Sequence, residues 1–162
     1  YVEKILSKGS NKFLIDNYEI INLNIHDLPT QINYKFHIGD YFKKTGNEIY
    51  INLNLFKDYY NTYLPVDRLT PRENDYKYVK EEITTLIIPD GYEVEYLPEG
   101  MVERGPFLGL ELSYTHIKSK IILKKKFYLD YLLLRPENFP QWNESVKKIS
   151  IAYKESIILK KK

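Results

Sequence analysis

Hydrophobic and polar residues alternate with a period of two along most of the N-terminal half of the chain. In residues 18–26, 32–38 and 49–55, one parity carries mainly Ile, Leu, Tyr and Phe, and the other mainly Asn, Lys and His. Successive side chains of a β-strand point to opposite faces of the sheet, so this period predicts three strands with one buried face each. The residues Lys44-Thr45-Gly46-Asn47 are typical of a hairpin turn that places Gly46 or Asn47 at positive φ.

The C-terminal half continues this pattern in longer segments. Strands are predicted at residues 76–88, 92–96, 108–114, 121–131 and 156–159. The first two are separated by Pro89-Asp90-Gly91, a sequence typical of tight turns. Long strands joined by short turns form an antiparallel sheet, and a second layer must cover its apolar face.

One segment follows the period of a helix instead. Its apolar residues are spaced three or four apart and comprise Phe139, Trp142, Val146, Ile149 and Tyr153. This spacing predicts an amphipathic helix over about residues 138–154, with Trp142 as its anchor in the core. Pro136 and Pro140 suit the first turn, where backbone N–H groups lack intrahelical partners.

These elements predict an all-β protein, an antiparallel immunoglobulin-like β-sandwich with one helix near the C-terminus. We expect residues 1–162 to form one sandwich module. An alternative is a subdivision into residues 1–60 and 64–162, because the alternation is lost in the Pro- and Tyr-rich residues 57–75. The pattern does not choose between these two organisations.

Composition and charge exclude several classes of function. The net charge is only +2, from 24 basic and 22 acidic residues, so we expect no nucleic-acid partner. The chain has no cysteine, which excludes disulfides, thiolate metal sites and a cysteine nucleophile within these residues. No apolar run approaches the roughly 20 residues of a membrane-spanning helix. Because the first residue is Tyr1, we expect a processed chain or a part of a larger protein.

No motif for covalent chemistry is present, and we expect neither an enzyme nor a cofactor. His26, His37 and His116 lie on the polar sides of predicted strands. His26 and His37 with Asp27 could bind zinc, but nothing fixes a third protein ligand, so solvated strand histidines and no metal are expected. Glu93, Glu95, Glu99 and Glu103 are interpreted as an exposed strand face balanced by lysines and not as a calcium site, because they lack the ligand spacing of a calcium loop. Lys124-Lys125-Lys126 straddles both faces of a strand, so only two of the three point the same way and no nucleic-acid patch is expected.

Tyrosine is the unusual residue of this chain, with 16 copies. Five of them flank or lie in the Pro-rich connection and form the candidate binding cluster: Tyr59, Tyr60, Tyr63, Tyr76 and Tyr78. Exposed rings on a β-sandwich can stack on sugars or on a partner protein. The competing interpretation is that the rings fill the seam between the two halves, since large apolar side chains are mostly buried.

The sequence Ile88-Pro89-Asp90-Gly91-Tyr92-Glu93-Val94-Glu95-Tyr96-Leu97-Pro98 resembles the iPxGyxVexLP stretch of a bacterial domain of unknown function. The ending of the chain, residues 131–161, resembles the same domain. The resemblance is best over residues 64–162, and the first 60 residues are similar to the sandwich portion upstream. Members of that family carry this domain at the C-terminus of Gram-negative envelope proteins, after a transglutaminase-like domain.

The resemblance implies an accessory role at the periplasmic or extracellular side of the cell. The transglutaminase-like neighbour uses a Cys-His-Asp triad, whose nucleophile cannot lie in a chain without cysteine. We therefore expect a non-catalytic structural or protein-interaction module, whose partners are adjacent domains of the same polypeptide or another protein. The alternative is a glycan-binding module that uses exposed tyrosines.

Overall fold

The computed structural model describes residues 13–162, which divide into two compact units between Lys43 and Lys44. Residues 57–75, which contain the candidate boundary between two halves, lie within the second unit. Each unit is described by itself.

The first unit is a β-hairpin of β1 (Phe13–Ile21) and β2 (Gln31–Ile38), paired antiparallel from Phe13↔Ile38 to Ile21↔Gln31. The alternating pattern predicted a strand as far as His26, but β1 ends at Ile21. Asn22 adopts a positive φ of 60°, and the amide of Ile25 donates to its carbonyl at 3.2 Å, so the chain turns here. Asn is among the few residues that tolerate this left-handed conformation, and the turn therefore overrides the alternation.

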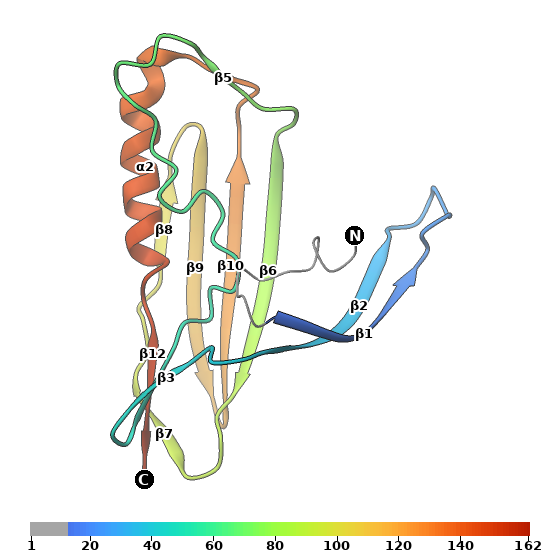
Figure 1. The fold of residues 1–162 in the computed structure, drawn as a ribbon, viewed down its shortest axis with the longest axis vertical. Helices are drawn as coiled ribbons and strands as arrows, with labels where there is room; N and C mark the ends of the chain where they lie inside the picture. Colours follow the sequence, from blue (N-terminus) through green and yellow to red (C-terminus); the bar gives the residue numbers. More distant parts are fainter. Residues whose placement is uncertain (1–12) are drawn as a thin grey trace. The chain divides into compact units, whose positions relative to one another are not determined.

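The second unit contains two four-stranded antiparallel sheets. The long sheet has the order β6-β10-β9-β8 (Figure 1), and its strands are β6 (Tyr78–Ile87), β8 (Met101–Arg104), β9 (Leu108–Ile117) and β10 (Lys120–Leu129). The short sheet has the order β3-β4-β12-β7, and its strands are β3 (Lys43–Thr45), β4 (Glu48–Ile51), β7 (Tyr92–Tyr96) and β12 (Ile157–Lys161).

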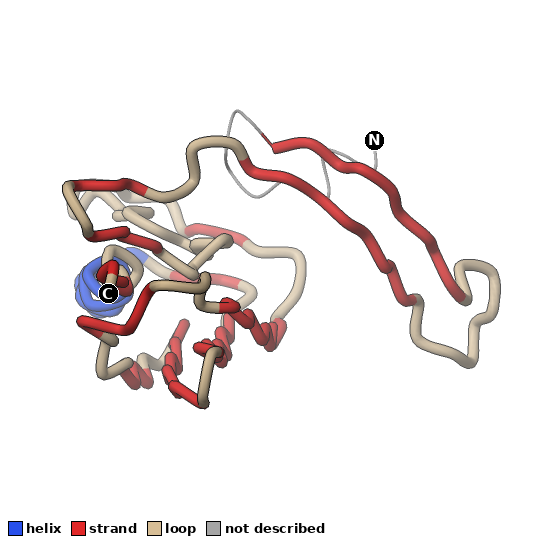
Figure 2. The backbone as a smooth tube through the Cα atoms, turned by 90° about the horizontal axis from the view of Figure 1, so that it is seen from below, coloured by secondary structure: helices blue, strands red, loops and turns tan. Residues whose placement is uncertain are grey.

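A single α-helix, α2 (Phe139–Ala152), follows a short 3-10 turn, η1 (Pro136–Asn138). The short strands β5 (Arg72–Glu73) and β11 (Leu133–Leu134) pair at the end of the long sheet where α2 begins. Helix α2 and the short sheet lie on the same face of the long sheet (Figures 1 and 2). They form the second layer that the long sheet requires.

The core lies between these layers. The predicted helical stripe is fully buried, and so are inward residues of β9, β10 and β12, among them Leu110, Phe127 and Ile157. The prediction of an all-β sandwich with one C-terminal helix is confirmed, including the positive φ of 60° at Gly46 in the first hairpin of this unit. Within residues 13–162 no helix is both long and apolar enough to cross a lipid bilayer.

The third predicted strand, residues 49–55, is shorter in the structure. Strand β4 ends at Ile51, and both Leu53 and Asn54 are buried beyond it. Two neighbours of opposite parity cannot both face the core from one regular strand. The chain therefore leaves the sheet here and begins the irregular segment on which the candidate site is built.

Candidate functional site

Residues 52–64, here called the inner segment, run beside α2 without regular secondary structure. Three side chains of α2 make hydrogen bonds to backbone groups of the inner segment. Trp142 Nε1 donates to the carbonyl of Thr62 at 2.9 Å, and Ser150 Oγ accepts from the amide of Asn61 at 2.9 Å. Buried backbone groups outside helices and sheets need such partners, so the helix acts as a template for the segment.

Asn143 makes the third and most specific of these contacts. Its Oδ1 accepts from the amide of Leu64 and its Nδ2 donates to the carbonyl of the same residue, both at 2.8 Å. One side chain thereby reproduces the pairing of a β-bridge. Asn143-Glu144-Ser145 also matches the acceptor motif for N-glycosylation. Both polar atoms of the Asn143 side chain are hydrogen-bonded to Leu64.

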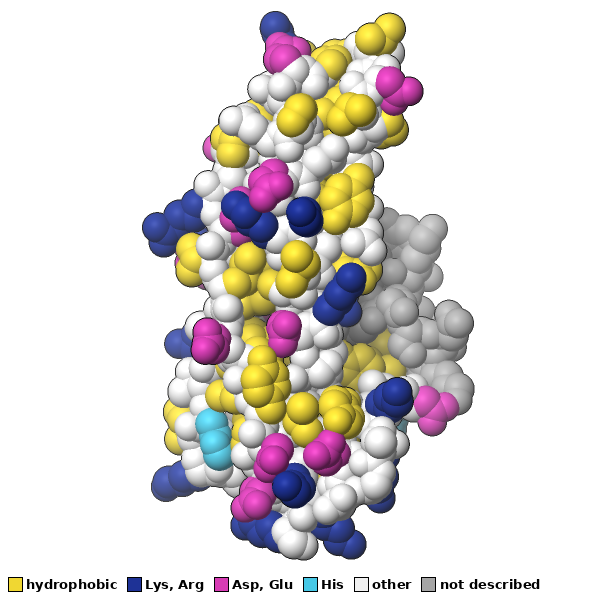
Figure 3. All heavy atoms as spheres, turned by 90° about the vertical axis from the view of Figure 1, so that its left-hand side faces the viewer, with side chains coloured by type: hydrophobic (Ala, Val, Ile, Leu, Met, Phe, Trp, Pro, Cys, Tyr) yellow, Lys and Arg dark blue, Asp and Glu magenta, His cyan; other side chains and the backbone are white. Residues whose placement is uncertain are grey.

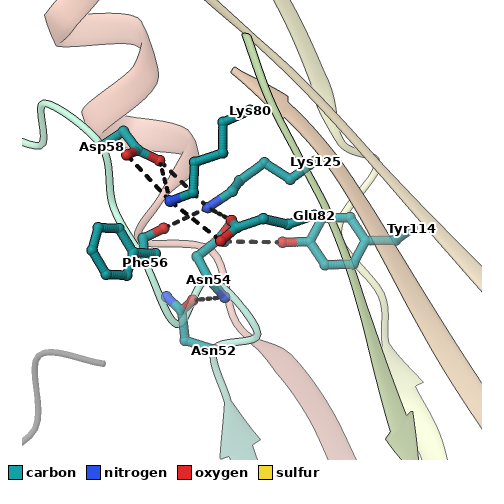
Figure 4. Close-up of polar contacts among 8 residues, drawn as sticks. All are labelled: Asn52, Asn54, Phe56, Asp58, Lys80, Glu82, Tyr114 and Lys125. Carbon is teal, nitrogen blue, oxygen red and sulfur yellow. Dashed lines mark hydrogen bonds and ion pairs between the residues drawn. The ribbon is translucent and has the colours of Figure 1, made fainter. Parts of the chain in front are cut away.

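A cluster of four charged side chains lies at the start of the inner segment, here called the ionic cluster (Figure 4). Lys125 of β10 is paired with Glu82 of β6, directly opposite in the sheet register, and its Nζ also donates to the carbonyl of Phe56 at 2.7 Å. Lys80 lies 3.3 Å from Glu82 and 3.4 Å from Asp58. Two positive and two negative charges therefore balance one another.

Burial and pairing shift the pKa values of the central pair. Burial lowers the pKa of Lys125 below its usual value, against the opposing effect of Glu82 and Asp58. Burial opposes the charge of Glu82, but its hydrogen bond to Lys125 and the charges of both lysines outweigh this, so the pKa of Glu82 is lowered. The carboxylate of Glu82 is thus stabilised in its charged form.

The geometry of the ionic cluster suits fixation better than chemistry. Only 3% of the Lys125 side chain is exposed, and its ammonium group is held by Glu82, the Phe56 carbonyl and, at 3.8 Å, Asp58. A nucleophilic lysine must be within reach of a substrate, whereas the Lys125 ammonium group is enclosed by these partners. The cluster binds the inner segment to the long sheet.

Two of the five predicted tyrosines are half-buried and pack against aromatic residues of the core. Tyr59 stacks on Phe127 with 5.8 Å between ring centroids and meets Trp142 edge-on at 5.2 Å. Arg72 lies over the ring of Tyr59 at 5.2 Å, and Tyr78 packs against Phe127 at 5.9 Å. Burial raises the pKa of Tyr78 well above its usual value, and nearby Tyr59 and Asp58 add to this.

The other three tyrosines do not join this packing as a group. Tyr63 is 47% exposed and Tyr76 is 65% exposed, while Tyr60 is half-buried below Lys57, whose Nζ lies 5.4 Å from its ring centroid. The structure therefore separates the predicted cluster into half-buried rings at positions 59, 60 and 78 and exposed rings at positions 63 and 76. Tyr59 also has a positive φ of 55°, which is unusual for an aromatic residue.

An open groove of about 510 Å³ lies at the other end of α2. Its lining includes the apolar residues Leu97, Met101, Leu112 and Ile151 together with glutamate and tyrosine side chains. Tyr96 donates a hydrogen bond to Glu155 at 3.2 Å, and the charge of Glu155 raises the pKa of Tyr96. The side of the molecule seen in Figure 3 shows hydrophobic side chains next to acidic ones.

The three histidines lie in separate places. His37 Nδ1 is hydrogen-bonded to Asp16 at 2.8 Å within the hairpin of the first unit, and His26 lies in the turn after β1. His116 Nε2 lies 2.8 Å from the carbonyl of Lys118 in the second unit. Across residues 13–162, no three His, Asp or Glu side chains are arranged to hold a metal ion.

The acidic residues 93–103 are divided among several neighbours. Glu95 pairs with Lys160 at 3.3 Å, and Glu103 pairs with Lys148 at 3.1 Å while accepting from Ser145 at 2.9 Å. Glu99 lines the groove. These residues therefore do not converge on one point.

The ionic cluster was missed by the sequence interpretation, although one signal pointed to it. Alternation in residues 121–129 places Lys125 on the same face as Leu123 and Phe127, with Lys124 and Lys126 opposite. A lysine on the apolar face requires a carboxylate partner. Glu82 could not be identified as that partner because β6 and β10 are not consecutive strands.

The family match lies within the second unit. Residues 47–159 match the family described as "Domain of Unknown Function with solved-structure structure (DUF3858)". The fold is similar to a crystal structure from Parabacteroides distasonis described as that of a "putative protease", with a TM-score of 0.51 and 13% sequence identity. The match covers 61% of this chain and only 20% of that chain. No curated protein matches the sequence significantly.

Proposed function

Because the chain belongs to the family of the domain of unknown function DUF3858, we propose that it is a non-catalytic module of a larger polypeptide. Its role is structural or that of a protein-interaction surface, and its neighbour is a transglutaminase-like domain. The polypeptide is located in the periplasm or outside the cell.

The observation that carries this proposal is the use of the buried polar groups around the inner segment. Lys125 and the polar side chains of α2 are bonded to the backbone of that segment. Hydrogen bonds of this kind hold the backbone of the inner segment in one conformation. The solved structure of similar fold supports a modular role, because the matched part is one fifth of its chain.

The structural role is tested in the full-length polypeptide, expressed with and without residues 44–162. We expect removal to lower solubility and to speed the proteolysis of the remainder. A remainder with unchanged solubility and protease resistance would contradict a structural role. Binding of the separated remainder to added residues 44–162 would then distinguish an interaction role from none.

The absence of catalysis is tested with the present chain alone. Purified protein is incubated with peptide and ester substrates, each with and without an amine acceptor. We expect no turnover above that of buffer. Turnover that disappears in the Lys125→Met variant would assign chemistry to the ionic cluster and overturn the proposal.

Glycan binding is a second candidate, supported by the exposure of Tyr63 and Tyr76. A glycan array probed with the intact chain tests it, and the Tyr63→Ala and Tyr76→Ala variants locate the site. Binding that both variants retain would place the glycan site elsewhere. Absence of binding by the intact chain would contradict glycan binding.

A further inference from the structure

Strand β6 forms one edge of the long sheet (Figure 1). Strand β10 pairs with it on one side, and no strand within residues 13–162 pairs with it on the other. At ten residues it is as long as the central strands. A long edge strand offers a row of backbone donors and acceptors to another strand.

The direction of these backbone groups follows from the register with β10. The amide of Ile88 donates to the carbonyl of Ser119 at 2.8 Å, and the pairing continues without a shift from Leu86↔Ile121 to Tyr78↔Leu129. Hydrogen-bonded pairs recur at every second residue of an antiparallel ladder. The even-numbered residues of β6 therefore bond to β10, and the odd-numbered residues 79–87 direct their N–H and C=O groups to the open edge.

The same odd-numbered residues place their side chains on the outer face of the sheet. In chain order they are Val79, Glu81, Ile83, Thr85 and Ile87. Val79, Ile83 and Ile87 are 60%, 71% and 67% exposed. The order apolar, polar, apolar, polar, apolar reads the same in both directions. Such a sequence is complementary to itself when two copies run antiparallel.

We propose that β6 pairs antiparallel with β6 of a second copy of this chain, about a two-fold axis at Ile83. In this register Ile83 lies opposite Ile83 of the second copy, Val79 opposite Ile87, and Glu81 opposite Thr85. Each apolar side chain meets an apolar one, and no two like charges lie directly opposite. The two long sheets join into one continuous sheet, as expected for an isologous dimer.

Neighbouring registers are less favourable. An axis at Glu81 or Glu82 places a glutamate opposite its own copy, where like charges repel. An axis at Thr84 sets Ile83 against Thr85 and Glu81 against Ile87. An axis at Thr85 shortens the pairing and brings in Pro89, which has no N–H to donate. The axis at Ile83 alone pairs residues 79–87 over their full length with matched side chains.

This dimer goes beyond the proposed function, since a structural module could equally be monomeric. Its first test is the molar mass of the purified chain, measured by light scattering over a dilution series. We expect a concentration-dependent dimer. The Ile83→Lys variant brings two lysines together at the axis and should weaken dimerisation roughly tenfold or more, with an unchanged circular dichroism spectrum because position 83 is exposed.

The register is tested by cysteine crosslinking, which is clean because the chain contains no cysteine. Hydrogen-bonded antiparallel partners have Cα atoms about 5.5 Å apart, within the range that a disulfide bridges. The Ile83→Cys variant should therefore form covalent dimers on mild oxidation. Val79→Cys alone should not, because its two copies would lie about 27 Å apart at roughly 3.4 Å per residue.

A mixture of the Val79→Cys and Ile87→Cys variants should crosslink to each other. The matched control is Ile122→Cys, in the central strand β10 on the same face of the sheet. A chain that is monomeric at its highest soluble concentration would overturn the proposal. Crosslinking of Ile122→Cys as strong as that of Ile83→Cys would also overturn it, because contact would then be made through the face instead of the edge.

Discussion

Lys125 lies on the core face of β10 and is nearly inaccessible to solvent. Transfer of an ammonium group out of water costs several kcal/mol unless its partners are well placed. Glu82 and the carbonyl of Phe56 are these partners, and Asp58 and Lys80 complete the charge balance. The contribution of Lys125 to stability is therefore seen mainly when it is removed, because its carboxylate partners then lose a buried counter-charge.

Replacement of Lys125 by Met should lower the free energy of unfolding by about 3 kcal/mol at neutral pH, because it leaves Glu82 and Asp58 sharing a single cation. The double variant Lys125→Met/Glu82→Leu should regain most of this loss, since the Asp58–Lys80 pair remains. Urea unfolding measures both values. Lys126→Met is the matched control: its ion pair with Glu81 is exposed, so we expect the free energy of unfolding to stay essentially unchanged. Equal losses at positions 125 and 126 would contradict this account of the cluster.

Tyrosines with raised pKa values make the stability of the folded protein decrease at high pH. Burial raises the pKa of Tyr131 to about 12, and it raises the pKa values of Tyr78 and Tyr153 further. In the unfolded chain these groups ionise near pH 10. A raised pKa in the folded state contributes stability that is complete below pH 10 and is lost as the pH rises above it.

A spectrophotometric titration at 295 nm, followed together with Trp142 fluorescence, measures this loss of stability. We expect some tyrosines to ionise only as the protein unfolds above pH 10. The Tyr153→Phe variant should unfold at a higher pH, because one of the responsible groups is absent. Ionisation of all 16 tyrosines near pH 10 with the fold intact would contradict the prediction.

At the scale of elements, α2 and the inner segment depend on each other. The helix would present an isolated apolar stripe without the sheet, and the inner segment would have unpaired backbone groups without the helix. Asn143 joins them at Leu64 through two hydrogen bonds.

The Asn143→Ala variant should leave the Leu64 amide and carbonyl without these partners and lower stability by about 1–3 kcal/mol. Hydrogen exchange should accelerate over residues 60–65 while the amides of β9 and β10 stay protected. Glu144→Ala, at the exposed neighbouring position, is the control. Unchanged exchange in the Asn143→Ala variant would mean that the inner segment is held by other contacts.

The regular elements were predictable because their side chains repeat. Alternation identified β6, β9 and β10, and the 3–4 spacing located α2 within two residues of its ends. The inner segment was not predictable, since Asn52 and Asn54 continue the alternation of β4 although the chain has left the sheet. Strand β8 is only four residues long, too short for its period to stand out. The ionic cluster depends on a pairing of distant strands that no local pattern specifies.

In the whole molecule, residues 44–162 contain the helix, the buried core and both four-stranded sheets. Only Lys43, the first residue of β3, lies outside them. The family match, residues 47–159, lies inside this unit. The contacts that fix the inner segment also lie inside it. We therefore expect this unit to fold and remain stable by itself.

The most direct test is to express residues 44–162 alone and to follow urea unfolding by Trp142 fluorescence and by circular dichroism. We expect coincident, cooperative transitions with a stability close to that of the full 162 residues. An unfolded or molten fragment, or two transitions that do not coincide, would contradict this expectation.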